Sequence, residues 1–312
     1  MDRMRGTVLL LGAALVWGMA FAFQTQASGS IGPFSFVAAK SALAAGALGI
    51  VAGIRHFSTC KPTAAQESFA AVAADSNSRR ALIVGGIACG IVLFAADNLQ
   101  QAGITVYPVD AAASGRAGFL TATYVVMASL ASPFLGKKIH PMVFAAAGVC
   151  IVGMYLLCLS GGIDGVYAGD LICLAGAVFY TVHLFIIDRF AKCDPVKLTM
   201  LQFITSAVIS GIAAVVFEHP APEVFLGALG PLLYVGVISG GVGYTLQTAG
   251  QRYADPAVAA IVMSLESVFA AVGGWLLLGE VLGGRELLGC ALMFAAVLLA
   301  QVPELAKSRA KS

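Results

Sequence analysis

Four ionisable residues interrupt long apolar stretches of this sequence: Lys40, Asp97, Arg116 and Glu266. A charge in the middle of a membrane-spanning helix costs at least about 2.5–3.5 kcal/mol, so such a residue needs a partner or a function. Opposite charges at one depth can bind a charged solute or pair with each other. An isolated carboxyl group in lipid favours its neutral form and can take up and release a proton.

Three of these charges are predicted to share one depth in the membrane. Lys40 follows Pro33 by seven residues and Arg116 follows Pro108 by eight, which places both about 10–12 Å from one surface at 1.5 Å per residue. Asp97 precedes the same end of its own segment by a similar distance. Two cations and one carboxylate would line a polar cavity that favours an anionic or zwitterionic ligand. The alternative is a structural Lys–Asp or Arg–Asp pair, with the other cation reaching outward to water.

Glu266 stands alone. It lies ten residues after Pro256, about 15 Å deep and therefore near the midplane, and no Lys or Arg is expected at that depth in its half of the chain. Glu266 is our candidate for a proton-coupling carboxylate. The alternative is a glutamate that only holds helices together, bonded to Ser264 or Ser267.

Aromatic and amide side chains at matching places in the two halves of the chain are candidates to line the same cavity. Trp17 matches Tyr180, Lys40 matches Gln202, and Tyr124 matches Glu266. The further candidates are Gln101, Tyr244 and Gln247, with Gln100 nearby. For any single one, core packing or an interhelical hydrogen bond is the competing interpretation. His183 is expected toward the cytoplasmic side, as a structural residue or a proton relay.

The composition requires a membrane to hold these residues. The chain of 312 residues is 59% hydrophobic and 11% charged, with a mean hydropathy of +0.91. Soluble domains carry about a quarter charged residues. Lipid leaves helices and closed barrels as the only spanning structures, and no segment here alternates as barrel strands do. The predicted fold is an all-α integral membrane protein with ten transmembrane helices, at 6–26, 33–54, 80–103, 108–132, 139–159, 167–188, 195–217, 226–248, 256–278 and 284–302.

The distribution of Lys and Arg predicts the orientation. With the N-terminus in the cytoplasm, 15 of the 18 Lys and Arg residues fall in cytoplasmic segments, which follows the positive-inside rule. Arg285 alone falls in an outer loop. We therefore expect a multi-pass protein of the cell (inner) membrane with both termini cytoplasmic. The long cytoplasmic connection 55–80 is either a solvated loop or contains a short interfacial helix.

The ten spans divide into two sets of five, residues 1–160 and 161–312. Because each set has an odd number of spans, the second set is inserted in the membrane with the opposite orientation. Weak matches occur in the same order in both sets. Gln100-Gln101-Ala102-Gly103 ends the third span as Gln247-Thr248-Ala249-Gly250 ends the eighth. Inverted repeats of this kind enclose one central site that can open to either side.

The chain resembles the EamA-type ten-helix members of the drug/metabolite transporter (DMT) superfamily over nearly its whole length. Four motifs carry the resemblance: Leu15-Val16-Trp17-Gly18, Gly115-Arg116-Ala117-Gly118-Phe119-Leu120-Thr121, Ser264-Leu265-Glu266-Ser267-Val268-Phe269 and Leu278-Gly279-Glu280. It implies two inverted five-helix repeats, cytoplasmic termini and export of a small metabolite, and it favours a structural or gating role for Arg116. Lys40 stands where the family commonly has Arg. Ser267 follows Glu266 where it commonly has Pro, which predicts a straighter ninth span.

These patterns favour a secondary transporter of small organic metabolites, amino-acid-like and anionic or zwitterionic, that works by alternating access with its substrate and the lipid bilayer as partners. No nucleotide-binding loop, H-E-x-x-H or G-x-S-x-G motif occurs, so we expect no enzyme, cofactor or metal, and the basic residues predict no nucleic-acid partner. We expect the seven cysteines to act as small apolar packing residues. An intramembrane enzyme and a non-transporting scaffold or sensor are the alternatives. The oligomeric state is not predicted.

Overall fold

The computed structural model describes residues 2–58, 76–108, 113–137, 139–158, 167–269, 272 and 283–309. Every regular element within these residues is helical. The prediction of an all-α membrane protein is therefore confirmed. The middle of the 55–80 connection, for which a solvated loop or a short interfacial helix was expected, lies outside the described residues, which resume at Ser76.

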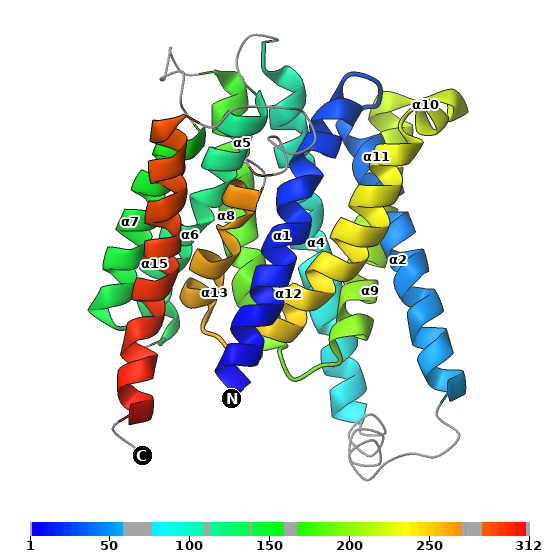
Figure 1. Ribbon diagram of the computed structural model, residues 1–312. Coiled ribbons are helices and arrows are strands. Elements are labelled where there is room, and N and C mark those ends of the chain that lie inside the picture. The colour runs from blue at the N-terminus through cyan, green and yellow to red at the C-terminus, as the bar shows by residue number, and fades with distance from the viewer. Residues whose placement is uncertain are drawn as a thin grey trace.

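The helices alternate up and down across one slab (Figure 1). In chain order they are α1 (Asp2–Ser28), α2 (Pro33–Ser58), α4 (Ser76–Val106), α5 (Ala113–Ala122), α6 (Tyr124–Ala131), η1 (Pro133–Leu135), α7 (Pro141–Cys158), α8 (Ala168–Arg189), α9 (Pro195–Ala213), η2 (Ala214–Glu218), α10 (Pro222–Gly227), α11 (Leu229–Leu233), η3 (Tyr234–Gly243), α12 (Tyr244–Gly250), α13 (Pro256–Met263) and α15 (Gly284–Arg309).

The apolar helices match the predicted spans. Six are long and apolar enough to cross a membrane, and four shorter apolar helices occupy the places of the fourth, fifth, ninth and tenth spans: Ala117–Ala131, Pro141–Leu156, Pro256–Phe269 and Leu287–Ala300. Large apolar side chains such as Val215 and Phe217 face outward, where lipid would cover them. Proline starts α2, α7, α9 and α13, because the first turn of a helix does not need the missing N–H. Pro108 lies just after α4, and residues 109–112 between it and α5 are outside the described part.

Helix packing follows an approximate twofold symmetry between the halves. Three spans contact their own counterparts: α2 packs on α9, α7 on α15, and α6 on α13. The remaining spans pack on the counterpart of their neighbour. The third span packs on the sixth (α4 on α8), and the equivalent eighth span packs on the first (η3 and α12 on α1). Because successive spans alternate in direction, α8 runs opposite to α1, and α1 begins at the face where α15 ends (Figure 1). The proposed boundary at 160/161 falls outside the described residues.

Matched glycines show this symmetry at the level of atoms. A Cβ added to Gly103 of α4 would lie 3.2 Å from the Gly169 carbonyl oxygen of α8, and one added to Gly250 of α12 would lie 3.1 Å from the Gly6 carbonyl oxygen of α1. Such close approach requires the small residue at both crossings. The two Gln-x-Ala-Gly segments recognised in the sequence therefore make equivalent contacts.

The eighth span differs from its counterpart by one residue. Gly90 of α4 packs on the Gln202 carbonyl and Gly236 of η3 packs on the Lys40 carbonyl, so the two glycines are equivalent. Gly103 follows Gly90 by 13 residues, whereas Gly250 follows Gly236 by 14. The wider turns of a π-helix accommodate an inserted residue, and η3 is a π-helix over Tyr234–Gly243.

The fourth and ninth spans are both interrupted immediately before a candidate site residue. A turn at Thr123 separates α5 from α6, which begins at Tyr124, and a turn at Ser264 and Leu265 ends α13 before Glu266. The Thr123 and Ser264 hydroxyls each donate to the carbonyl oxygen three residues earlier, which competes with helical hydrogen bonding. The ninth span, expected to be straighter without proline, thus contains a turn whose local cause is a hydroxyl bonded to the backbone.

Candidate functional site

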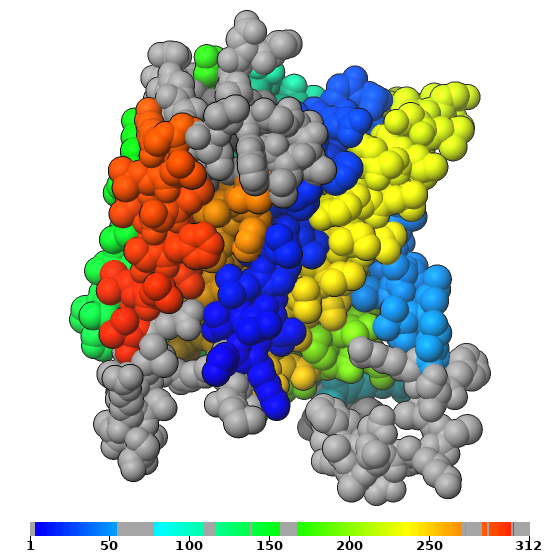
Figure 2. All heavy atoms as spheres, in the orientation of Figure 1, coloured from blue at the N-terminus to red at the C-terminus, as the bar shows by residue number. Residues whose placement is uncertain are grey.

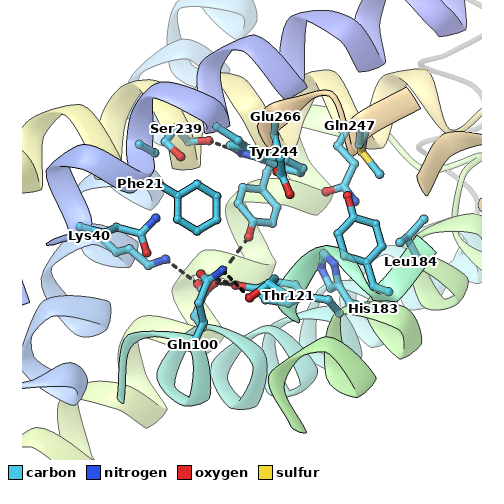
Figure 3. A pocket seen from close by; sticks show the side chains of 17 residues that line it. Phe21, Lys40, Gln100, Thr121, His183, Leu184, Ser239, Tyr244, Gln247 and Glu266 are labelled. Atoms are coloured by element: carbon cyan, nitrogen blue, oxygen red, sulfur yellow. Dashed lines mark hydrogen bonds and ion pairs between the residues drawn. The ribbon is translucent and has the colours of Figure 1, made fainter. Parts of the chain in front are cut away.

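A buried cavity of about 60 Å³ lies where the two halves meet. This volume holds a few water molecules or a small solute. Figure 3 shows Lys40 at one end and Glu266 and Gln247 on the opposite side. The lining consists of Trp17, Ala20, Phe21, Gln24, Lys40, Asp97, Gln100, Thr121, Tyr124, Tyr180, His183, Leu184, Ser239, Tyr244, Gln247, Met263 and Glu266.

One end of the cavity, which we call the ion-pair end, holds Lys40, Asp97, Tyr180, Gln100 and Thr121. Lys40 Nζ lies 2.8 Å from Asp97 Oδ2, and both side chains are buried. The Tyr180 hydroxyl donates to Asp97 Oδ1 at 2.7 Å and lies 3.0 Å from Gln100 Oε1. Gln100 Nε2 in turn donates to Thr121 Oγ1 at 3.2 Å. Side chains from α2, α4, α5 and α8 thus form one connected network.

The opposite end, which we call the carboxylate end, holds Glu266, Gln247 and Tyr124. Glu266 is 5% exposed, and within the described residues it has neither an ion pair nor a hydrogen bond. The Tyr124 hydroxyl and Gln247 Oε1 are also buried without a hydrogen-bond partner in that part of the chain. Glu266 lies close enough to Tyr124, Tyr180 and Tyr244 to interact with them electrostatically. These buried acceptors remain available to a solute.

Eight of the predicted site residues line this cavity together. They are Trp17, Lys40, Asp97, Tyr124, Tyr180, Tyr244, Gln247 and Glu266. Lys40 and Asp97 were expected either to line a cavity or to form a structural ion pair. They do both, because their buried ion pair also faces the cavity.

Two predicted residues, Gln202 and Gln101, are placed differently, and a third is not described. Gln202 lies behind the lining, where its Oε1 is 3.0 Å from His183 Nε2. Gln101 Nε2 is directed to the Gln24 carbonyl oxygen at 3.5 Å. The Arg116 side chain lies outside the described residues. The described lining therefore contains one cation, Lys40, which is paired with the Asp97 carboxylate. It does not show the predicted excess of two cations over one carboxylate.

Several lining residues were not singled out from the sequence as site candidates. Phe21 and Gln24 follow Trp17 by four and seven residues, so helical spacing was an available signal for both. Thr121 precedes Tyr124 by three residues in the same way. Ser239 had no such signal: its backbone carbonyl, in π-helix η3, accepts a hydrogen bond from Trp17 Nε1 at 3.2 Å.

Two polar contacts join helices at opposite ends of the bundle. Glu218, at the end of η2, accepts hydrogen bonds from the backbone N–H groups of Phe34 and Ser35 at 2.8 and 2.7 Å and so caps α2. Lys137, after η1, pairs with Asp188 near the end of α8 at 2.7 Å. In the described residues, no group of three His, Cys, Asp or Glu side chains is placed to hold a metal ion.

Comparison with known proteins agrees with the fold. Residues 167–301 match the model of the EamA-like transporter family. A protein of Archaeoglobus fulgidus named an uncharacterized transporter is 29% identical over 218 residues, which are 69% of this chain and 67% of that protein. A crystal structure, described only as that of a protein, superposes with a TM-score of 0.72 at 20% identity and covers 95% of this chain and 98% of its own. That structure supports the fold alone.

An all-helical bundle of apolar spans around a polar cavity supports a multi-pass membrane protein. The match of residues 167–301 to the EamA-like transporter family and the relative named a transporter both agree with the resemblance to the drug/metabolite transporter superfamily.

Proposed function

We propose that this protein is a secondary transporter that exports small amino-acid-like zwitterions through the central cavity by alternating access. The observation that carries the proposal is the cavity itself, which lies at the junction of two inverted repeats and presents charges at two separate ends. Such a site can open to either face when the two halves rock against each other.

The balance of charge favours a zwitterion over an anion. Lys40 is already neutralised by Asp97, and Glu266 adds a further carboxylate. A solute that carries only a negative charge would find no uncompensated cation in the described lining. A zwitterion can place its ammonium group near Glu266 and its carboxylate toward Lys40. The aromatic walls, Trp17 and Tyr244 with ring centroids 4.8 Å apart, suit an apolar side chain.

The energy source is proposed to be a gradient, since the sequence has no nucleotide-binding loop. Glu266 is our candidate for coupling transport to protons. The titratable side chains that share the cavity with it are Tyr124 of α6, Tyr180 and His183 of α8, Tyr244 of α12, and the ion pair of α2 and α4. The distribution of Lys and Arg supports an inner-membrane location with both termini in the cytoplasm.

Counterflow in proteoliposomes tests the proposal. Vesicles that contain the full chain are preloaded with a panel of unlabelled amino acids, and uptake of the labelled forms is followed. We expect at least one zwitterion to exchange and Lys40→Met to abolish that exchange. Lys197→Met, which removes an exposed lysine at the start of α9, is the matched control and should transport normally.

The same vesicles test proton coupling. Glu266→Gln should remove the pH dependence of exchange, whereas Glu223→Gln, at an exposed position of α10, should keep it. Chemical turnover without translocation would exclude a carrier. A Glu266→Gln variant that retained full proton coupling would restrict Glu266 to a structural role.

A further inference from the structure

Glu266 shares its end of the cavity with hydrogen-bonding groups that have no partner. Among the described lining residues, Gln247 Oε1 and the Tyr124 hydroxyl, which can accept as well as donate, lack hydrogen-bond partners. The buried Glu266 carboxylate makes no ion pair with the described residues. Buried acceptors without donors cost about 1–3 kcal/mol each and are rare in folded proteins. Two such groups beside a buried carboxylate that has no cation indicate a missing donor.

The ion-pair end has no such deficit. Asp97 accepts from Lys40 and Tyr180, and Gln100 and Thr121 bond to each other. A positively charged ligand would be repelled by Lys40 there and would have to displace an existing partner of Asp97. The carboxylate end has neither obstacle.

We infer that the carboxylate end is a recognition site for an ammonium group that still carries N–H bonds, a primary or secondary amine, and that it excludes quaternary ammonium. This inference rests on the proposed function and specifies which part of a substrate binds where. Glu266 supplies the charge, and Gln247 Oε1 and Tyr124 Oη accept the remaining N–H donors.

The discrimination follows from the number of donors. A primary ammonium offers three N–H groups, which match three acceptors. A trimethylammonium group has the same charge but none of these donors, so it would bury the acceptors unsatisfied. The faces of Trp17 and Tyr244 attract either cation through the ring quadrupole and do not distinguish between them. Selectivity therefore depends on the acceptors.

A matched series of ligands tests this inference without a carboxylate in the ligand. Benzylamine, N-methylbenzylamine, N,N-dimethylbenzylamine and benzyltrimethylammonium keep one positive charge and one ring while the N–H count falls from three to none. Binding to the full chain in lipid nanodiscs is measured by calorimetry at one pH where all are cationic. We expect affinity to fall along the series, by about tenfold or more between the ends, since hydrogen bonds to charged groups are the stronger ones.

Variants assign the effect to the named groups. Tyr124→Phe should weaken benzylamine binding several-fold and leave benzyltrimethylammonium binding unchanged, and Glu266→Gln should weaken both. Tyr253→Phe, which removes a hydroxyl outside the cavity lining, is the control for Tyr124. Equal affinity for all four ligands, or preference for the quaternary one, overturns the inference. So does the absence of binding by any of them.

The result is separable from the test of the proposed function. If zwitterions exchange in counterflow but the benzylamine series shows no gradient, the protein is a carrier and the ammonium site is wrong. If the gradient is present but no solute exchanges, the ammonium site stands and the carrier function fails. Preferred binding of neutral benzyl alcohol over benzylamine would indicate that Glu266 holds a proton instead, and it would overturn the inference.

Discussion

The two ends of the cavity solve the problem of buried polarity in opposite ways. At the ion-pair end, Lys40 and Asp97 neutralise each other and Tyr180 completes the network. Their counterparts in the second repeat, Gln202 and Tyr244, carry no charge. At the carboxylate end, Glu266 is charged and its counterpart Tyr124 is not.

This difference suggests a structural role for one end of the cavity and a ligand-binding role for the other. A network in which every group has a partner fixes helices in place, whereas a buried group without a partner lowers stability unless a ligand completes it. The ion-pair end therefore has the character of a structural anchor that also faces the cavity. The carboxylate end has the character of a binding site that awaits its ligand. Perturbing each end in the same way should reveal the contrast.

The largest expected effect follows from removal of the Lys40 charge. Lys40→Met leaves Asp97 as an uncompensated buried charge, which should lower the free energy of unfolding by about 3–5 kcal/mol. Unfolding in mixed detergent, followed by circular dichroism, measures the change. Lys40→Met combined with Asp97→Asn should recover most of the lost stability, without recovery of transport. An unstable double variant would contradict the role of the pair.

A smaller loss of stability is expected when a tyrosine hydroxyl is removed, and the two ends of the cavity should differ in it. Tyr180→Phe removes a hydrogen bond to the Asp97 carboxylate and should cost about 1.5–3 kcal/mol. Tyr124→Phe removes a hydroxyl that has no partner in the described structure, so its cost should be near zero or slightly favourable. The same unfolding assay applied to both variants distinguishes them. Equal losses would show that the two ends are not different in kind.

The helix crossings, where the two halves are alike, provide a third comparison. An alanine at Gly103 or at Gly250 crowds a carbonyl oxygen of the facing helix, and each should cost about 1–3 kcal/mol. We expect the two losses to be similar. Gly211→Ala is the control, because nothing described lies within 4 Å of the added carbon. A large difference between the losses would mean that the asymmetry extends beyond the cavity.

Much of the fold was predictable because it depends on patterns that lipid enforces. Apolar length and the prolines at Pro33, Pro141, Pro195 and Pro256 located the spans, and the Gln-x-Ala-Gly segments identified equivalent crossings. The matching positions in the two halves were the reason to expect Trp17, Tyr180, Tyr124 and Glu266 in one cavity. A shared depth made a Lys40–Asp97 pair one of the two expected arrangements, and the structure contains that pair.

Other features depend on atomic detail that spacing does not contain. The sequence placed Gln202 in the cavity, but rotation about its helix axis turns it to His183. It left open whether Asp97 would pair with Lys40 or with Arg116. The interruption at Ser264 was missed because its cause is a hydroxyl bonded to the backbone rather than a proline.

The additional residue in η3 has a consequence for energetics. In a carrier made of two identical inverted halves, exchanging their conformations would convert the inward-facing form into the outward-facing form, and both would be equally populated. The eighth span has one residue more than α4, and the π-helix that accommodates it carries the Ser239 carbonyl bonded to Trp17. Under the alternating access that we propose, one orientation of the empty protein would therefore have the lower free energy, and each cycle would begin from a preferred side.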